Sequence, residues 1–373
     1  MKKIVINALI YKQNSSGIGV MIRELFGEFA KVVETPCQII LSKDSPDIQC
    51  DDSVTCVRAP WYYRQGIRRI FYQTAILGWK YCKNSFLLTI DSKVPLILPR
   101  NCEIIPIITD LAVFRMSEVY QKSRVLLWKL QYQFIRRRTT HYFTISEFSK
   151  QEMIDILQIP SEQIRILPCA CAENYQRVED VAQLTAFRTK YQLSEHYILF
   201  VGNQNPRKNL ECVIRAFDRV KMKNDICHQL VIIGEMGWKF NVSKVLAGIN
   251  FTKDIRFVGF VPDAEMPMAY SAADLFVFPT LYEGFGVPVL EAQKCGTAVL
   301  TSKCSALPEV GGDGAWYVDP HCEEQIADGI EQLLRNEKIR EDLIQKGYQN
   351  VKRFSWKNSA EILRQELEKI GEL

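Results

Sequence analysis

The segment PTLYEGFGVPVLEAQKCGTAVLTSKCSALPE, residues 279–309, holds two glutamates eight positions apart, Glu283 and Glu291. Between them stand Gly284, Phe285, Gly286, Val287 and Pro288. Glycine lets backbone N–H groups approach a ligand closely, because no side chain intervenes. Proline suits the first turn of a helix, where its missing N–H has no partner to lose. We therefore predict a strand over 274–278, a tight loop, and a helix over 287–295 that ends at Gly296.

Such a loop has a chemical use as well as a structural one. A helix N-terminus that follows a glycine-rich loop attracts an anion such as a diphosphate, because unpaired N–H groups and the helix dipole point at it. An ordinary strand-to-helix turn of an α/β protein carries the same glycines. The loop alone leaves both interpretations open.

The composition is that of a globular protein with two domains. The chain has 373 residues, of which 47% are hydrophobic and 24% charged, enough for a sizeable core in each half. No apolar run approaches the roughly 20 residues that span a bilayer. The first residues, MKKIVINALIYK, contain Asn7 and no small-residue cleavage site, so we predict a buried strand there rather than a signal peptide.

Cysteine spacing and net charge narrow the function classes. The twelve cysteines show no Cys-x-x-Cys pair and only four histidines accompany them, which gives little support to a zinc site. Without a secretion signal, we expect reduced thiols in a cytoplasmic protein.

Residues 1–180 hold 24 Lys and Arg against 18 Asp and Glu, and the remainder holds 23 against 25. The basic first half favours an anionic surface or substrate, but the charge is too weak to indicate nucleic-acid binding.

The first half alternates strands and helices. A strand over Lys3–Ala8 leads through Gly17 and Gly19 into an amphipathic helix, as in a Rossmann-like unit, although Ile22 replaces the third glycine of the dinucleotide fingerprint. Further strands are predicted at Gln38–Leu41, Val54–Val57, Phe86–Ile90, Glu103–Ile108 and His141–Ile145. Alternating βα units form a parallel sheet covered by helices, with ligands at the carboxyl ends of its strands. We therefore place the two glycines, Thr109-Asp110 and Ser146-Glu147 on one edge, with Ser146 also capping a helix.

Two basic aromatic stretches stand out in this half, at residues 61–83 and 126–138. Segments of this kind lie at an anionic membrane surface or bind a lipid-linked anion. They also occur as surface helices whose aromatic side packs on the domain. The sequence leaves both interpretations open.

The second half begins a new series of βα units. We take residues 168–185 as the connection between the domains. A strand at Tyr197–Val201 is followed by Arg207 and Lys208, just before a helix that starts at Leu210 with Asn209 as its N-cap. Two cations beside a helix N-terminus form a diphosphate clamp, unless they are solvated loop charges. Strands at Leu230–Ile233, Ile255–Val258, Leu275–Phe278 and Ala298–Thr301 predict a second parallel sheet.

The second half resembles the retaining glycosyltransferases of the GT-B fold, and is similar to glycosyltransferase family 4 (glycosyl transferases group 1). The motifs that carry the resemblance are VGNQNPRKNL (201–210), RFVGFVPDAEM (256–266), EGFGVPVLE (283–291), GTAVLTSKCSALPEVGGDGAWYVDP (296–320) and FSW (354–356). The first half matches more loosely, through GIG (17–19), ITDL (108–111) and TISEFSK (144–150). The resemblance implies an α/β GT-B architecture, with two Rossmann-like domains facing each other across a cleft. Residues 1–172 form the acceptor-side domain, residues 185–355 bind the nucleotide-sugar, and a C-terminal helix at about 357–373 packs back on the first domain.

The resemblance also implies which residues of this sequence form the site, at the positions that match the family's motifs. Arg207 and Lys208 would neutralise the donor diphosphate, Glu291 would bind the ribose hydroxyls, and Glu283 would lie beside the donor sugar. Asp110 would act on the acceptor side. The remaining donor contacts implied are Asn203, Phe260 framing the base, the loop residues Gly284, Phe285, Gly286 and Val287, and Gly17 and Gly19 from the first domain.

The implied reaction moves a hexose or deoxyhexose from a nucleoside-diphosphate sugar to a glycan or lipid-linked glycan, as in cell-surface polysaccharide synthesis. The enzyme would retain the anomeric configuration and work in the cytoplasm, including at the inner face of the membrane. No Asp-x-Asp motif occurs in the sequence, so we expect neither a metal nor another cofactor; the clamp would supply the positive charge.

Two departures from the family pattern keep alternatives open. Thr109 stands where many relatives carry a histidine, and Cys169-Ala170-Cys171-Ala172 replaces the usual Gly and Asp of the linker. The alternatives are a non-catalytic nucleotide-binding scaffold subunit and a GT-B-fold nucleotide-sugar epimerase.

Overall fold

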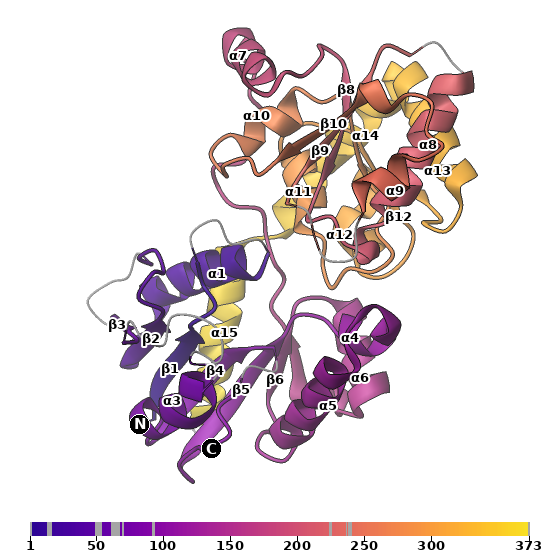
Figure 1. Ribbon diagram of the computed structural model, residues 1–373. Coiled ribbons are helices and arrows are strands. Elements are labelled where there is room, and N and C mark those ends of the chain that lie inside the picture. Colours follow the sequence, from indigo (N-terminus) through magenta and orange to yellow (C-terminus); the bar gives the residue numbers. More distant parts are fainter. Residues whose placement is uncertain are drawn as a thin grey trace. The chain divides into compact units, whose positions relative to one another are not determined.

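The structure is a computed structural model that describes residues 2–12, 17–48, 54–60, 68, 71–91, 94–223, 226–235, 237 and 241–371. It divides into two compact units. The first consists of residues 1–169 together with 355–373, and the second of residues 170–354. Each unit contains one parallel sheet flanked by helices (Figure 1), so the predicted α/β class with two Rossmann-like units is confirmed.

The sheet of the first unit has the order β3-β2-β1-β4-β5-β6-β7, with all neighbours parallel. Its strands are β1 (Lys3–Ala8), β2 (Cys37–Leu41), β3 (Val54–Arg58), β4 (Ser85–Ile90), β5 (Cys102–Ile108), β6 (Tyr142–Thr144) and β7 (Ile164–Ile166). All but the last were predicted. β7 is three residues long with the exposed Arg165 at its centre, too short to show an apolar pattern.

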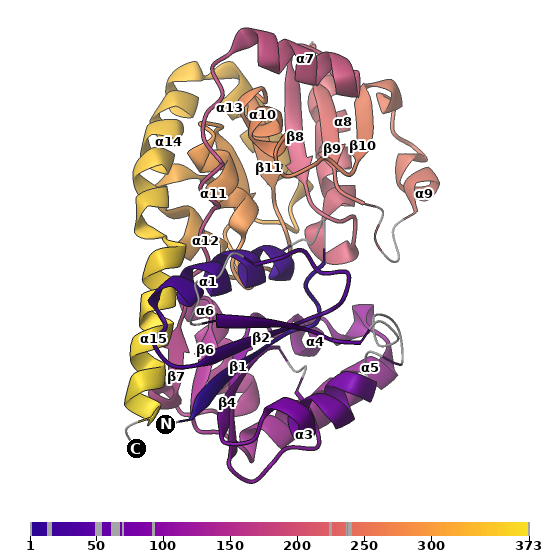
Figure 2. The ribbon, with the colours of Figure 1, turned by 90° about the vertical axis from the view of Figure 1, so that its left-hand side faces the viewer.

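Helices follow most of these strands. They are α1 (Ile18–Val32), the π-helical turn η2 (Tyr72–Ile76), α3 (Leu77–Tyr81), α4 (Ala112–Arg115), the 3-10 turn η3 (Ser117–Val119), α5 (Lys122–Arg136), α6 (Glu147–Leu157), the 3-10 turn η4 (Ser161–Gln163) and the C-terminal α15 (Trp356–Gly371). α15 lies alongside α1 in this unit (Figure 2). The Ser359 hydroxyl of α15 donates to the carbonyl of Pro168 over 2.7 Å. These contacts make the last helix part of the first unit's core.

The sheet of the second unit has the order β10-β9-β8-β11-β12-β13, again parallel throughout. Its strands are β8 (Tyr197–Val201), β9 (Gln229–Ile233), β10 (Ile255–Gly259), β11 (Leu275–Phe278), β12 (Val299–Ser302) and β13 (Trp316–Val318). The strand order reverses at β8, between β9 on one side and β11 on the other. Ligands of doubly wound sheets bind at the carboxyl ends of the strands beside such a reversal.

Helices and short turns of the second unit connect these strands. They are α7 (Val181–Tyr191), η5 (Pro206–Lys208), α8 (Leu210–Lys223), α9 (Val242–Leu246), η6 (Thr252–Asp254), α10 (Met266–Ser271), α11 (Val287–Lys294), α12 (Leu307–Gly311), η7 (Gly312–Gly314), α13 (Glu323–Arg335), α14 (Glu337–Asn350) and η8 (Val351–Arg353). β8 and β11 are almost completely buried. The core therefore fixes the starting points of the loops that leave the carboxyl ends of these two strands.

Two further observations bear on the sequence analysis. Every described cysteine carries a free thiol. Among the described residues, no helix combines the length and the apolar character needed to cross a membrane.

Candidate active site

The loop between β8 and α8 is tied to the loop that follows β11. Asn209 adopts a left-handed conformation with φ 60°. Its side-chain amide donates to the carbonyls of Pro279, over 2.9 Å, and Pro320, over 2.7 Å. Asn209 directly precedes α8, as predicted, and its carbonyl accepts from the N–H of Val213 over 3.3 Å. Its side-chain amide connects three loops at the carboxyl edge of the sheet.

Because these loops are tied together, the two predicted cations lie against Glu283, the first residue of the EGFG loop (residues 283–286). Arg207 Nη1 lies 3.1 Å from Glu283 Oε2, and Lys208 Nζ lies 2.6 Å from Glu283 Oε1. The three side chains are 20%, 12% and 10% exposed, respectively. They are not solvated loop charges but a mostly buried cluster with two positive charges and one negative.

Neighbouring groups fix the orientation of both cations. Arg207 also donates to the carbonyl of Tyr282 over 2.8 Å, and its own carbonyl accepts from the N–H of Leu281 over 2.9 Å. The Lys208 ammonium stands 4.7 Å from the ring centroid of Phe278, within the range of a cation–π contact. The cations are thus held before any ligand arrives, as electrostatic catalysis requires.

Glu283 is ionised in this setting. Burial opposes ionisation, but the charges of Arg207 and Lys208 and their hydrogen bonds outweigh burial and lower the pKa of Glu283 below its usual value. Its backbone N–H donates to the Ser305 hydroxyl over 3.2 Å. The carboxylate is therefore both charged and fixed in place.

The helix predicted after this loop is α11, with Pro288 in its first turn. Gly286 precedes it with φ 109°, and a Cβ there would lie 2.6 Å from Leu307 Cδ2. Only glycine fits this position without strain. Phe285, in contrast, is buried and packs edge-on against Phe354, with ring centroids 5.5 Å apart. Its side chain belongs to the core, while its backbone lies in the loop.

Glu291 projects from α11 toward two tyrosines that the sequence analysis missed. The Tyr270 hydroxyl of α10 donates to Glu291 Oε2 over 2.7 Å, and Tyr175 also acts to lower the pKa of this carboxyl. Burial raises the pKa of Glu291 to about 7, aided by Asp263 and opposed by the two tyrosines and Lys208. Both tyrosines are distant in sequence, and no local pattern marks them as partners of Glu291.

Two glycines after β9 were also missed. A Cβ on Gly234 would lie 2.3 Å from the Gly202 carbonyl oxygen, and one on Gly237 would lie 2.4 Å from that of Gln204. The loop after β9 therefore runs against the loop after β8, next to the exposed Asn203. Phe260, directly after β10, is 42% exposed, so its ring is available to a ligand at this edge.

The first unit presents its own polar group at the carboxyl ends of β4 and β5. Asp91, missed by the sequence analysis, accepts from both the N–H and the hydroxyl of Thr109, over 3.1 and 2.6 Å. The side chain of Asp110 accepts from the N–H of Ala112 over 3.0 Å. Thr109 thus holds the carboxylate of Asp91 at the carboxyl end of β5, next to Asp110 in the chain.

Two other predicted features of this edge are visible. Ser146 accepts from the N–H of Ser149 over 3.0 Å, so its predicted capping of α6 is confirmed. Gly17 stands at the N-cap position of α1 with φ 32°, and Gly19 is buried in the first turn. A side chain at Gly17 would meet no atom of the described residues within 4 Å.

Residues 185–350 match the family model for glycosyl transferases group 1. The chain belongs to this family.

Among relatives of this group 1 glycosyltransferase chain is the O-antigen chain mannosyltransferase B of Escherichia coli. It is 33% identical over 251 residues, which are 67% of this chain and 66% of that protein. The serotype-specific mannosyltransferase WbdA of Escherichia coli is 30% identical over 231 residues, 60% of this chain. The chain spans 28% of the length of this second relative.

The fold extends over the whole chain. The crystal structure of Anabaena HepE in complex with UDP and glucose superposes with a TM-score of 0.75, covering 99% of this chain and all of that one, at 14% identity. The GT-B fold expected from the sequence is therefore confirmed for this group 1 glycosyltransferase.

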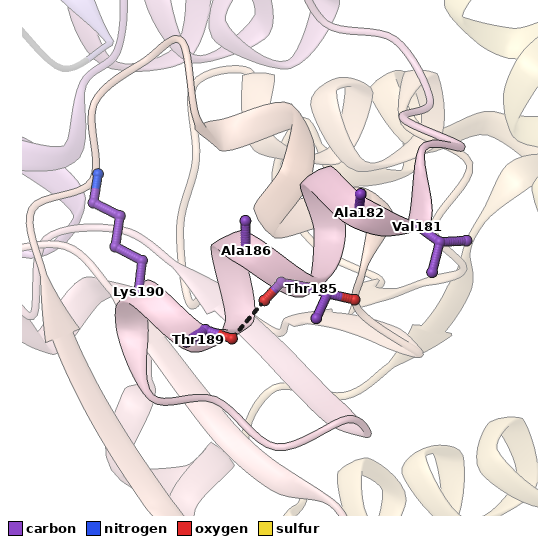
Figure 3. A pocket seen from close by; sticks show the side chains of 6 residues that line it. All are labelled: Val181, Ala182, Thr185, Ala186, Thr189 and Lys190. Atoms are coloured by element: carbon purple, nitrogen blue, oxygen red, sulfur yellow. Dashed lines mark hydrogen bonds between the residues drawn. The ribbon is translucent and has the colours of Figure 1, made fainter.

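A shallow depression lies elsewhere in the second unit, beside α7. It is lined by Val181, Ala182, Thr185, Ala186, Thr189 and Lys190 (Figure 3). Thr189 bonds the carbonyl of Thr185, and Lys190 pairs with Glu265. None of the residues of the cation cluster or of the EGFG loop borders it, so we assign it no part in the reaction.

Proposed function

We propose that this chain transfers a hexose or deoxyhexose from a nucleoside-diphosphate sugar to a glycan or lipid-linked glycan acceptor, in the synthesis of a cell-surface polysaccharide. Family membership supports the reaction class. The names of the two Escherichia coli relatives support mannose as the sugar and a growing polysaccharide as the acceptor.

The observation that carries the proposal is the cluster of Arg207, Lys208 and Glu283. When the glycosidic bond breaks, negative charge grows on the departing diphosphate. Two oriented, mostly buried cations stabilise that charge more in the transition state than in the bound substrate, and such preorganised groups are worth about 3–4 kcal/mol each. Before the donor binds, Glu283 serves as their counter-ion.

Glu283 and Glu291 take different parts in this scheme. Glu283 belongs to the cation cluster and would face the donor sugar, where its charge supports the anomeric carbon. Glu291, held by the hydroxyl of Tyr270, would accept hydrogen bonds from the ribose hydroxyls. The backbone of Gly284, Phe285, Gly286 and Val287, the side chain of Phe260, and Asn203 would complete the donor contacts.

The reaction would proceed with retention and without a metal ion at the donor diphosphate. The acceptor hydroxyl would attack from the face that the diphosphate leaves, and a phosphate oxygen would take its proton. Arg207 and Lys208 would supply the positive charge that a divalent cation supplies in other glycosyltransferases. In the first unit, Asp110 would orient the acceptor, and Gly17 and Gly19 would approach the donor phosphates.

The exposed side chains of helix α5 support the proposal of a peripheral contact with the inner face of an anionic membrane. Tyr132 and Ile135 pack one side of α5 into the core, whereas Leu126, Leu127 and Leu130 are each more than half exposed. Exposed basic residues, such as Lys129 and Arg136, share the same helix. Leucines beside cations match a surface of anionic headgroups over acyl chains. The other basic stretch, 61–83, lies partly outside the described residues.

A nucleotide screen tests the proposal. Calorimetry and thermal unfolding with UDP-, GDP- and dTDP-sugars should single out one tight donor, which raises the unfolding temperature by mass action. Transfer from that donor to a glycan acceptor should nearly vanish in Glu283→Ala and Lys208→Ala. Binding of no nucleotide would favour a scaffold subunit, and conversion of the free nucleotide-sugar without an acceptor would favour an epimerase.

A further inference from the structure

The opposite edge of the second sheet holds a cluster that the proposed reaction does not use. His228, His196 and Asp274 immediately precede β9, β8 and β11, which are three consecutive neighbours in the sheet. Because these strands are parallel, their first residues meet at the amino edge, away from the carboxyl edge that carries Arg207 and Lys208. Two of the chain's four histidines thus lie beside one carboxylate.

The distances within this cluster suit a metal ion. Asp274 Oδ2 lies 3.2 Å from His196 Nδ1 and 3.4 Å from His228 Nε2. One ligand atom from each of the three residues lies within 4.8 Å of the others. A tetrahedral zinc ion with ligands at about 2.0–2.1 Å holds neighbouring ligand atoms roughly 3.3 Å apart. The two oxygen–nitrogen distances already match that value.

The backbone holds the carboxylate in place. Asp274 Oδ2 accepts from the N–H of Tyr197 over 3.2 Å, and the N–H of Asp274 donates to the Tyr197 carbonyl over 3.0 Å. Since Tyr197 follows His196 directly, these bonds fix the carboxylate relative to the first histidine. The ligand set is therefore built on strand ends rather than on surface loops.

Burial differs between the two imidazoles. The side chain of His228 is 15% exposed, that of Asp274 30%, and that of His196 50%. Nδ1 of His228 is buried and has no hydrogen-bond partner among the described residues, whereas Nε2 of the same ring faces Asp274. One side of the cluster is closed by the protein, and the side of His196 faces water.

We propose that His196, His228 and Asp274 bind a divalent transition metal ion of the zinc class, with water in the remaining positions. Imidazole nitrogens combined with one carboxylate oxygen are ligands that Zn²⁺ accepts. The ion would fasten the starts of three central strands. It would take no part in sugar transfer, which the other edge of the sheet would perform.

Titration of the chelator-treated, full-length chain with Zn²⁺ tests this site. We expect one ion per chain from calorimetry, and a rise in unfolding temperature with added Zn²⁺. His228→Ala and Asp274→Ala should weaken binding by about tenfold or more. If either of these does not fold, the half-exposed His196→Ala provides the same test. The matched control is His141→Ala, since His141 Nδ1 also lies 3.2 Å from a carboxylate oxygen, that of Glu103, but is not part of a cluster of three such ligands among the described residues.

The absorption spectrum of bound Co²⁺ distinguishes binding at this cluster from binding by cysteine thiolates. The wild-type chain should bind Co²⁺ without a thiolate-to-cobalt absorption band, and removal of the metal should leave nucleotide affinity unchanged. Absence of Zn²⁺ binding, a thiolate band, or equal binding by wild type and the cluster variants would each overturn the proposal. The last outcome would leave the cluster as an ion pair between Asp274 and the histidines.

Discussion

The Tyr270 hydroxyl donates a hydrogen bond to the carboxylate of Glu291 across 2.7 Å. Tyr270 is completely buried, so it fixes the position of a charged group from inside the core. Because the carboxyl group is held in this buried position, the protonation state of Glu291 affects the free energy of unfolding. It also affects how Glu291 would bind its ligand.

The raised pKa of Glu291 predicts a specific pH dependence of stability. The pKa is about 7 in the folded chain, against an ordinary value of 4.5. The folded state therefore holds the proton more tightly, and this stabilisation is complete below pH 4.5 and is lost as the pH rises through 7. The difference amounts to roughly 3 kcal/mol.

Glu291→Gln isolates this contribution. The free energy of unfolding of the variant minus that of the wild type should be larger at pH 8 than at pH 5, as measured by urea unfolding at both pH values. Groups that titrate in the same way in both proteins contribute equally to both free energies of unfolding, so their contributions cancel in the difference. A difference between variant and wild type that is the same at the two pH values would contradict the burial of an ionisable carboxylate here.

Gly286 sets the geometry of the EGFG loop. Gly286→Ala should destabilise the chain by about 1–3 kcal/mol, because φ is 109° and the new Cβ would lie 2.6 Å from Leu307. Gly27→Ala is the control, since a Cβ there meets nothing within 4 Å in the helix α1. That change should be neutral or stabilise by up to about 1 kcal/mol. Equal effects of the two substitutions on the unfolding midpoint would refute the steric argument.

Asp110 tests the acceptor side. Asp110→Asn keeps an oxygen for the N–H of Ala112, so the fold should survive. Loss of the negative charge that would orient the acceptor should lower transfer about 100-fold, with nucleotide affinity unchanged. Asp155→Asn, on the exposed face of α6, should leave transfer at the wild-type rate. Full activity of the Asp110 variant would remove this residue from the acceptor site.

The exposed leucines of α5 test the membrane contact. Leu126→Asp combined with Leu130→Asp should abolish sedimentation with anionic vesicles without lowering the unfolding temperature, because both side chains are already exposed. Binding by wild type should also weaken as salt is added. Val181→Asp, also more than half exposed but on α7, is the control. Vesicle binding by the double variant at the wild-type level would show that α5 is an ordinary surface helix.

The sequence predicted the parts of the fold and site that depend on local pattern. Apolar runs located all strands except β7 and β13, which are three residues each. Glycines and charges at strand ends located the loops of Arg207, Lys208 and Glu283, because parallel strands bring their carboxyl ends to one edge.

The parts that escaped prediction depend on contacts between distant residues. Tyr270 and Tyr175 reach Glu291 from other elements, and Asp91 meets Thr109 across two strands. His196, His228 and Asp274 are 32 and 46 positions apart along the chain. The side-chain bonds of Asn209 to Pro279 and Pro320 were not predicted, because these partners become neighbours only in the folded sheet.

Lys208 and Arg207, as the holders of a donor diphosphate, are the central residues of the proposed site. The most direct test is calorimetry of the preferred nucleoside diphosphate with wild type, Lys208→Ala and the control Lys190→Ala, whose lysine forms an exposed pair with Glu265. We predict that Lys208→Ala weakens binding at least tenfold, as loss of a charge-assisted bond of about 1.5–3 kcal/mol requires, while Lys190→Ala binds like wild type. Equal affinity in all three proteins would contradict the assignment.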